Sequence, residues 1–463
     1  MTGAPAAALA LPYNWFFGLT MTLSPAAATA NGDKNSKLVP HGILWAFILL
    51  TSCFAWWGLA NNMTDTLLAA FKRIKSMSDF QTSLIQIAFY GSYFCFALPA
   101  AIYIKKFSYK SGVLLGLALF ISGGLLFYPA SMTMEYWHFL AALYILAGGL
   151  SILETSANPY VIVLGPEETG TQRLNLAQSF NPIGSIMGVV ISKFFILSEL
   201  QELSAEQRTA MAPEDLLGVQ KGELTAVMGP YVVVSIILVV IWILIAMCKM
   251  PAASDQTNGV STNLNLGPAF RRLLHNRHYV WGVAAQFFYV GAQIGVWSFT
   301  IRYVMRELNL NEEQSSTYYI AALVLFAISR FVCTGLMSVF TPRQILFSLS
   351  LLACACTGMV MFAGGYAGVI ALVCISGCMS LMFPTIYGLA VEGLGGDTKI
   401  GGSGLIMAIL GGAVMTAIQG QISDLTGSIR MSYAIPLACF VIIAFYAISA
   451  SKKDLPPSLE KIA

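Results

Sequence analysis

Long apolar stretches separated by short polar turns run along almost the whole chain. A helix rises about 1.5 Å per residue, so about 20 apolar residues are needed to cross the roughly 30 Å hydrocarbon core of a bilayer. Twelve stretches are long enough, and we expect each to form one membrane-spanning helix. The predicted spans are residues 42–71, 80–104, 111–130, 137–165, 174–197, 230–248, 278–305, 314–340, 343–363, 366–394, 399–423 and 430–450.

Composition supports this pattern. Of the 463 residues, 57% are hydrophobic and only 10% are charged, which is typical of a polytopic membrane protein surrounded by lipid. A polar stretch rich in Gly, Pro, Ser and Asn separates the sixth span from the seventh and is typical of a linker. The predicted organisation is a cytoplasmic tail at 1–41, a six-helix bundle at 42–248, a cytoplasmic linker at 249–277, a second six-helix bundle at 278–450 and a cytoplasmic tail at 451–463.

The two halves share a weak internal repeat. In span four, Pro159 stands 14 residues before Arg173, and in span ten, Pro384 stands 15 residues before Lys399. Matching positions in two six-span halves are typical of a duplicated transporter. The predicted fold class is therefore an all-α membrane protein, with twelve transmembrane helices in two six-helix pseudo-symmetric bundles.

The distribution of basic residues predicts the orientation. Lys and Arg are concentrated in cytoplasmic loops, and cytoplasmic termini place fifteen basic residues on that side and seven on the other. We therefore expect a multi-pass protein of the bacterial cytoplasmic (inner) membrane, with both termini inside and residues 1–41 retained as a tail. The net charge of +3 follows from this bias and gives no reason to expect a nucleic-acid partner. We expect a monomer.

The cysteines and histidines do not suggest a metal site. Cys374 and Cys378 share a helix face, but no His or carboxylate joins them at the spacing of metal ligands. The four histidines stand at span ends, and no span carries the His-containing metal or nucleophile constellation of an enzyme. We therefore predict no metal, no cofactor and no enzymatic activity.

Two carboxylates interrupt apolar spans: Asp65 in span one and Glu154 in span four. An acid at bilayer depth costs roughly 2.5–3.5 kcal/mol and usually faces a cavity or a partner. A buried carboxyl without a cation is pushed toward its neutral form, which suits proton exchange. We predict that both acids couple transport to protons. A structural ion pair of Glu154 with Lys193, Arg302 or Arg330 remains open.

Polar and aromatic side chains share one helix face in each of three spans. Amides and carboxylates bind hydroxyl groups, and aromatic rings cover the apolar faces of sugars, so these stripes predict a cavity for a hydroxyl-rich solute. Polar contacts between helices are the alternative. The stripes are Trp57, Asn61, Asn62 and Asp65 in span one; Asn175, Gln178, Asn181 and Ser185 in span five; and Gln286, Tyr289, Gln293 and Trp297 in span seven.

Several stretches resemble the fucose:proton symporter family of the major facilitator superfamily. They include LANNMTD at 59–65, LETSANPYVIVLGPE at 153–167 and RLNLAQSFN at 173–181, and further matches extend over both halves. The resemblance implies that Asp65 and Glu154 are the proton-coupling carboxylates, and that Asn62, Gln178 and Asn181 are amides of the sugar pocket.

The sequence departs from this family ahead of the proline in span ten. Met382 and Phe383 stand where a Gln-Tyr pair is expected, so the pocket would offer two fewer polar groups there.

These observations predict proton-coupled uptake of a neutral monosaccharide by alternating access, with L-fucose or a related hexose as the substrate. A symporter of glucose, galactose or mannose, with sodium as a possible coupling ion, is the alternative within transport. A sugar receptor or a membrane-embedded enzyme is the alternative of another class.

Overall fold

The computed structural model describes residues 38–75, 79–196, 205–250 and 266–451. Most of the predicted tail at 1–41, residues 251–265 of the predicted linker and residues 452–463 lie outside the described residues. The side chains of Asn61, Asp65 and Lys193 also lie outside the description, although the backbone of each belongs to a described helix.

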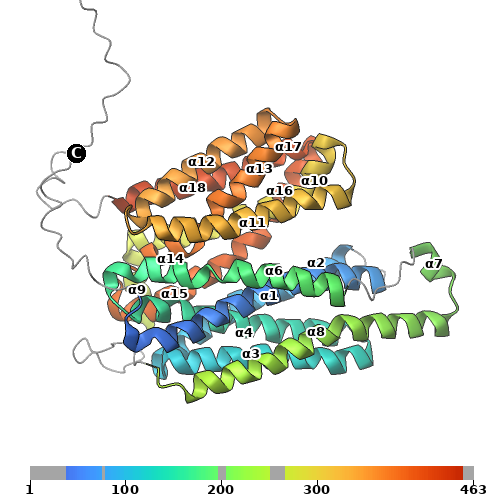
Figure 1. Cartoon of the computed structure of the whole chain (residues 1–463), viewed down its shortest axis with the longest axis horizontal. Coiled ribbons are helices and arrows are strands. Elements are labelled where there is room, and N and C mark those ends of the chain that lie inside the picture. The colour runs from blue at the N-terminus through green and yellow to red at the C-terminus, as the bar shows by residue number, and fades with distance from the viewer. Residues whose placement is uncertain (1–37, 76–78, 197–204, 251–265, 452–463) are drawn as a thin grey trace, which may run out of the picture. The chain divides into compact units, whose positions relative to one another are not determined.

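The first half of the chain forms six membrane-length helical segments, which are seen in the lower part of Figure 1. Its helices are α1 (Leu44–Lys75), α2 (Asp79–Lys106), α3 (Tyr109–Thr133), α4 (Tyr136–Val163), α5 (Gly170–Gln178), α6 (Asn181–Phe195), α7 (Ala205–Ala210) and α8 (Pro213–Met247). A short 3-10 turn, η2 (His41–Ile43), precedes α1, and another, η3 (Glu167–Thr169), precedes α5.

The second half begins with the linker helix α9 and continues with six further segments. Its helices are α9 (Leu266–His275), α10 (Arg277–Leu308), α11 (Glu312–Leu336), α12 (Pro342–Phe362), α13 (Gly365–Met379), α14 (Met382–Val391), α15 (Thr398–Met407), α16 (Gly411–Thr426), α17 (Ile429–Ser432) and α18 (Ala434–Ser451). The 3-10 turn η5 (Gly395–Asp397) leads into α15, and η6 (Ala408–Leu410) joins α15 to α16.

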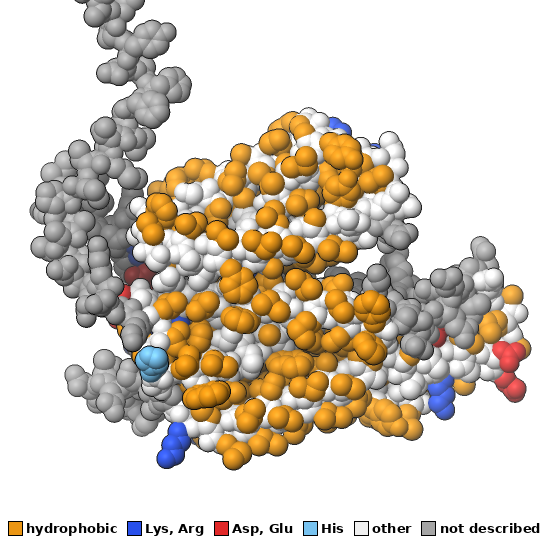
Figure 2. All heavy atoms as spheres, viewed as in Figure 1, with side chains coloured by type: hydrophobic (Ala, Val, Ile, Leu, Met, Phe, Trp, Pro, Cys, Tyr) orange, Lys and Arg blue, Asp and Glu red, His pale blue; other side chains and the backbone are white. Residues whose placement is uncertain are grey.

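Within the described residues, these helices account for the twelve predicted spans. Ten spans are long and apolar enough to cross a membrane by length and composition alone. The remaining two are the α5–α6 segment and α10, which is 32 residues long. Figure 2 shows hydrophobic side chains covering the visible sides of both blocks of helices, as lipid contact requires. The prediction of an all-α protein with twelve transmembrane helices is confirmed.

Helix α8 extends farther than the predicted span at 230–248, because it begins at Pro213. Proline fits the first turn of a helix, and the acidic residues Glu214 and Asp215 favour the positive end of the helix dipole. A buried ion pair holds α7 against this extension, with Arg208 donating two hydrogen bonds of 2.8 and 2.6 Å to Glu223. The polar stretch before residue 230 is therefore helical rather than a plain loop.

Glycine allows the first and fifth spans to cross closely. A Cβ at Gly184 in α6 would lie 1.7 Å from the carbonyl oxygen of Ala55 in α1, and one at Gly58 would lie 2.1 Å from the carbonyl oxygen of Asn181. The second half has a similar crossing, where a Cβ at Gly411 would lie 2.0 Å from the carbonyl oxygen of Phe287. Small residues let helix backbones approach in a membrane, so spans one and five, and spans seven and eleven, pair in the same way.

The two halves contact each other near the end of the molecule that carries the linker helix. Asn175 at the end of α5 donates a hydrogen bond of 3.2 Å to the Thr385 hydroxyl in α14. Gln172 donates another, of 3.2 Å, to the carbonyl of Thr334 in α11. Helix α15 packs against α2 and α4 of the first half. The halves are therefore closed together at this end.

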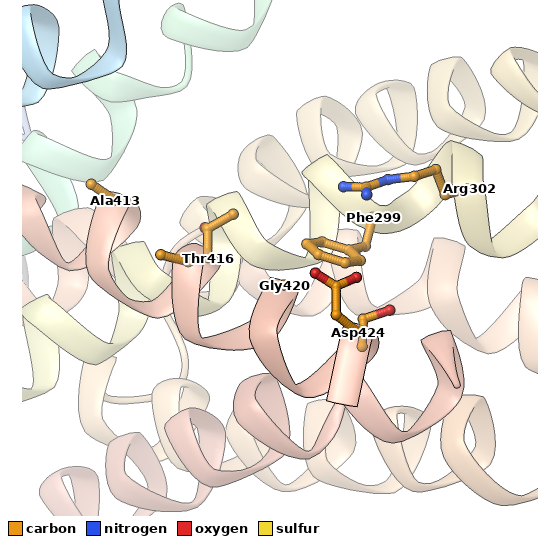
Figure 3. Close-up of a pocket in the computed structure, with 8 residues that line it drawn as sticks. Phe299, Arg302, Ala413, Thr416, Gly420 and Asp424 are labelled. Atoms are coloured by element: carbon orange, nitrogen blue, oxygen red, sulfur yellow. The ribbon is translucent and has the colours of Figure 1, made fainter. Parts of the chain in front are cut away.

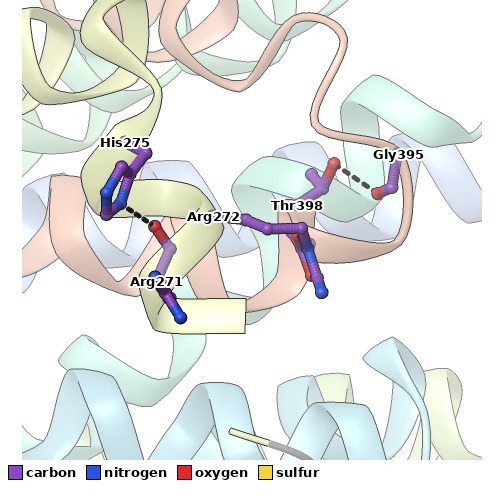
Figure 4. Close-up of polar contacts among 6 residues, drawn as sticks. Arg271, Arg272, His275, Gly395 and Thr398 are labelled. Atoms are coloured by element: carbon purple, nitrogen blue, oxygen red, sulfur yellow. Dashed lines mark hydrogen bonds and ion pairs between the residues drawn. The ribbon is translucent and has the colours of Figure 1, made fainter. Parts of the chain in front are cut away.

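The linker helix α9 is attached to the second half at this same end. Arg272 donates two hydrogen bonds to Asp397 in η5, with distances of 2.7 and 2.8 Å. Figure 4 shows Arg272 beside a second contact of the region, in which the Thr398 hydroxyl donates to the carbonyl of Gly395. The hydrogen bonds and the charge of Asp397 raise the pKa of Arg272. This ion pair joins the linker to the segment that leads into α15.

Candidate functional site

A central cavity of about 420 Å³ lies between the two halves. The first half supplies residues of α1, α2, α5 and α6, and the second half supplies residues of α10, α11, α14 and η6. Six of the predicted binding residues line this cavity. They are Trp57, Asn62, Gln178, Asn181, Gln293 and Trp297.

The amides of the first half are held in place by other polar groups. Gln178 lines the cavity, although only 1% of its surface is exposed. Its Nε2 donates a hydrogen bond of 2.8 Å to Oδ1 of Asn158. Asn181 Nδ2 donates one of 3.3 Å to the Phe54 carbonyl. Asn62 Nδ2 donates one of 3.4 Å to the carbonyl of Gly58, on its own helix. This wall therefore offers amide groups with fixed orientations.

The predicted stripe in span five is divided in two. The helix breaks between Gln178 and Asn181, where Pro182 begins the next helix. Gln178, Asn181 and Ser185 line the cavity, whereas Asn175 lies outside its lining and bonds to the opposite half through Thr385. Asn175 and Gln178 both lie in α5, one turn apart, so α5 itself serves both the closed end and the cavity.

Aromatic rings form much of the remaining wall. The Trp57 indole donates a hydrogen bond of 2.7 Å to the Tyr93 hydroxyl, which fixes both rings. Across the cavity, Trp297 donates one of 3.2 Å to the Ser376 hydroxyl, and its ring meets Phe326 edge to face. Aromatic faces beside fixed amides suit a ligand that has both hydroxyl groups and apolar C–H faces.

Two residues of the predicted stripe in span seven do not line the cavity. Tyr289 is fully buried, and its hydroxyl donates a hydrogen bond of 3.1 Å to the Met379 carbonyl. Gln286 is also fully buried, and neither polar atom of its amide has a hydrogen-bond partner among the described residues. The stripe therefore serves the cavity only in its second part, through Gln293 and Trp297.

Glu154 lies in α4 with 1% of its surface exposed. Within the described part of the chain, neither carboxyl oxygen has a hydrogen-bond partner and no cation forms an ion pair with it. The Tyr93 hydroxyl is the polar neighbour that interacts with this carboxyl, in a geometry outside that of an ordinary hydrogen bond. Asn158, one helical turn later, accepts the hydrogen bond from Gln178. A buried carboxyl in these surroundings favours its neutral form.

The structure does not test the predicted positions of the Asp65 and Asn61 side chains, because both lie outside the description. Their backbone belongs to α1, the helix that carries Trp57 and Asn62 into the cavity. Asp65 follows Asn62 by three residues, so helical geometry places it on a neighbouring part of the same face.

Sequence reasoning missed several lining residues. Arg330 was considered as an ion-pair partner of Glu154, yet it lines the cavity and is 3% exposed. It donates hydrogen bonds to the carbonyls of Ser380 and Gln178, the latter at 3.0 Å, and its guanidinium lies 4.7 Å from the centre of the Phe326 ring. A cation in an apolar span was the signal that could have identified it. The aromatic residues of α2, Phe89, Tyr90 and Tyr93, were also missed.

The fold and the cavity define a membrane carrier, built from two helical halves around a polar site that lies near the breaks in its helices. The family model described as Major Facilitator Superfamily matches residues 45–407, and the chain belongs to this superfamily. Membership confirms the prediction of a transporter.

Relatives and solved structures narrow this class. The chain is 40% identical to the L-fucose-proton symporter of Escherichia coli (strain K12), with 90% of this chain and 94% of that protein covered. It is 32% identical to a glucose/galactose transporter of Brucella abortus, with 93% and 98% covered. The crystal structure of the transporter FucP in the outward conformation matches with a TM-score of 0.82 and 40% identity, covering 88% of this chain and 98% of FucP. The predicted resemblance to the fucose:proton symporter family is confirmed.

Proposed function

We propose that this protein takes up a neutral monosaccharide together with a proton by alternating access, and that L-fucose or a related hexose is the substrate. One observation carries the proposal: the cavity amide Gln178 is bonded to Asn158, which stands one helical turn from the buried carboxyl of Glu154. A sugar that binds Gln178 can thereby influence the surroundings of a group that exchanges protons. The relationship to L-fucose-proton symporters supports the same reading.

Desolvation explains why proton and sugar would move together. Closing a cavity over an ionised carboxylate is costly, so the carrier crosses most easily when its carboxyls are protonated and its polar cavity is filled. In this mechanism, Asp65 takes up a proton from the outer cavity, and sugar binding favours closure. Glu154 then controls reorientation and release on the inside. Trp57, Asn61, Asn62, Gln178, Asn181, Gln293 and Trp297 would hold the sugar, while Tyr289 would support the wall from behind.

The orientation of the protein in the membrane is part of the same proposal. With both termini in the cytoplasm, the closed end that carries α9 is cytoplasmic, and the cavity is reached from outside. We expect a monomer in the bacterial cytoplasmic membrane, since one chain supplies both halves of the cavity.

Glucose or galactose is the second candidate substrate. Phe383 lines the cavity in place of a polar residue, and Met382 is fully buried behind it, so the pocket has an apolar surface where hydroxyl recognition was expected. The relationship to glucose/galactose transporters favours the same alternative.

Counterflow in proteoliposomes tests the substrate and the coupling ion. Vesicles preloaded with L-fucose, D-glucose, D-galactose or D-mannose are given the labelled form of the same sugar, and the transported sugar should show rapid exchange. In sodium-free buffer at constant membrane potential, an inward proton gradient should then drive its accumulation. Accumulation only with a sodium gradient would identify sodium as the coupling ion. Binding without exchange would instead indicate a receptor.

Replacing Asp65 by Asn should remove the pH dependence of sugar accumulation, because the amide keeps the size of the side chain but cannot exchange a proton. The measurement is initial uptake of labelled sugar from pH 5.5 to 8.5 under a fixed gradient. Asn35→Asp in the amino-terminal tail serves as a control for a change of one charge. Accumulation with an unchanged pH profile in Asp65→Asn would exclude this residue from coupling.

A further inference from the structure

A second pocket, of about 250 Å³, lies between α10 and α16, apart from the central cavity. Figure 3 shows the Asp424 carboxylate and the Arg302 guanidinium near the two sides of the Phe299 ring. The guanidinium carbon lies 4.2 Å from the centre of that ring. The complete lining is Phe299, Arg302, Ala413, Thr416, Ala417, Gly420, Ser423 and Asp424.

The polar groups of this pocket are not satisfied by one another. Among the described residues, neither Arg302 nor Asp424 forms an ion pair within 4.0 Å. Both side chains are exposed, so the Asp424 carboxylate and the Arg302 guanidinium are accessible to a ligand from solution.

The pocket lies farther along the same helices that build the central cavity. On α10, Trp297 and Ile301 face the central cavity, whereas Phe299 and Arg302 face the second pocket. On the eleventh span, Ile409 faces the central cavity, and the second pocket begins one turn later at Ala413. The second pocket therefore lies toward the end opposite the linker helix, which is the outer end of the protein in the proposed orientation.

The chemistry of the lining selects a small neutral ligand with hydroxyl groups. Asp424 would repel an anion and Arg302 a cation, whereas their charges together leave no net preference. A carboxylate accepts hydrogen bonds from hydroxyls, a guanidinium donates to them, and the Phe299 ring can cover an apolar C–H face. The volume lies below the range of about 300–1,000 Å³ that is typical of drug-sized ligands, which suits one monosaccharide.

We propose that this pocket is an outer subsite, where the transported sugar binds before it enters the central cavity. The inference rests on the proposed function, because it takes the same sugar as the ligand. It differs in assigning a second binding site to residues that do not touch the central cavity.

Equilibrium binding to the purified full-length protein tests the subsite. The probe is the labelled hexose that shows counterflow, and the expected stoichiometry is two molecules per chain. Arg302→Gln and Asp424→Asn should each reduce it to one, while Gln178→Leu should remove the other, central site. In transport, the two outer variants should raise the apparent KM and leave kcat unchanged, because the sugar must then enter the central cavity without first binding outside it.

Arg306→Gln is the matched control, because Arg306 is an exposed cation one turn farther along α10 and does not line the pocket. Normal counterflow at saturating sugar verifies that each outer variant is folded. One bound sugar per wild-type chain, or two in both outer variants, would overturn the subsite and leave the proposed function intact. Displacement of the outer molecule by glycine would assign the pocket to zwitterions and would also overturn it. A wild-type chain that binds no hexose would contradict both proposals.

Discussion

Glu154→Gln is expected to abolish proton-driven accumulation of sugar while sugar exchange continues. The amide resembles the protonated carboxyl in size and neutrality, so the loaded carrier should still close around its sugar. The glutamine side chain cannot release a proton. The return of the carrier without sugar is therefore no longer coupled to the proton gradient. Glu154 is 1% exposed and forms no ion pair in the described part of the chain, so the substitution strands no cation.

Two transport assays on the same proteoliposomes separate these steps. Counterflow of labelled sugar should remain within about threefold of wild type, whereas accumulation against a sugar gradient should fall to the level of empty vesicles. Ser156→Ala is the matched control, since Ser156 is a buried residue of the same helix. Among the described residues, its hydroxyl bonds only to the carbonyl of Ile152 within that helix. Active uptake at the wild-type rate in Glu154→Gln would remove this residue from the coupling mechanism.

The membrane-spanning helices could be predicted because their main determinant is local. A run of about 20 apolar residues is sufficient to satisfy a bilayer, and this rule located segments as different as α3 and α18. It failed at the start of α8, where the helix continues beyond the apolar run to Pro213. There, the buried pair of Arg208 and Glu223 stabilises the extension, and a pair of this kind depends on how α7 folds back.

The cavity could be predicted only in part, because helical spacing gives a common face but not what that face meets. Gln178 and Asn175 were assigned to one stripe and both lie in α5, yet Gln178 reaches the cavity while Asn175, one turn earlier, meets Thr385 of the opposite half. Tyr289 has the same spacing as Gln293, but it meets the Met379 carbonyl of another helix. Which neighbour a side chain contacts depends on which spans pack together. The spacing of residues along one span does not predict that packing.

The buried contacts around Gln178 connect the two halves of the carrier to the candidate proton site. Its side chain binds Asn158 in α4, while its backbone carbonyl accepts a hydrogen bond of 3.0 Å from Arg330 in the opposite half. Glu154 stands one turn before Asn158. A movement of the halves that breaks the contact with Arg330 would therefore disturb the surroundings of Glu154. This physical connection relates proton exchange to the position of the halves.

Arg330→Met should favour opening of the closed end by about 2 kcal/mol, which is roughly a thirtyfold change in the equilibrium between the two conformations. Methionine keeps an apolar side chain against Phe326 but cannot bond to the carbonyls of Gln178 and Ser380. The measurement is the alkylation rate of a cysteine placed at Thr171, which packs against Gly388 at the closed end, in chains whose native cysteines are replaced.

The alkylation rate should rise in Arg330→Met, and concentrative uptake should fall, because the carrier then spends less time with its cavity open at the other end. Arg330→Lys should lie between Met and wild type, since an ammonium keeps the charge but cannot span both carbonyls as a guanidinium does. Thr334→Val is the control, because the Thr334 hydroxyl, as far as the structure describes the chain, bonds only to the carbonyl of Arg330 within α11. An unchanged alkylation rate in a folded Arg330→Met chain would show that the hydrogen bond from Arg330 to the Gln178 carbonyl does not hold the halves together. The closed end would then depend on Asn175, Gln172 and the packing of α15 against α2.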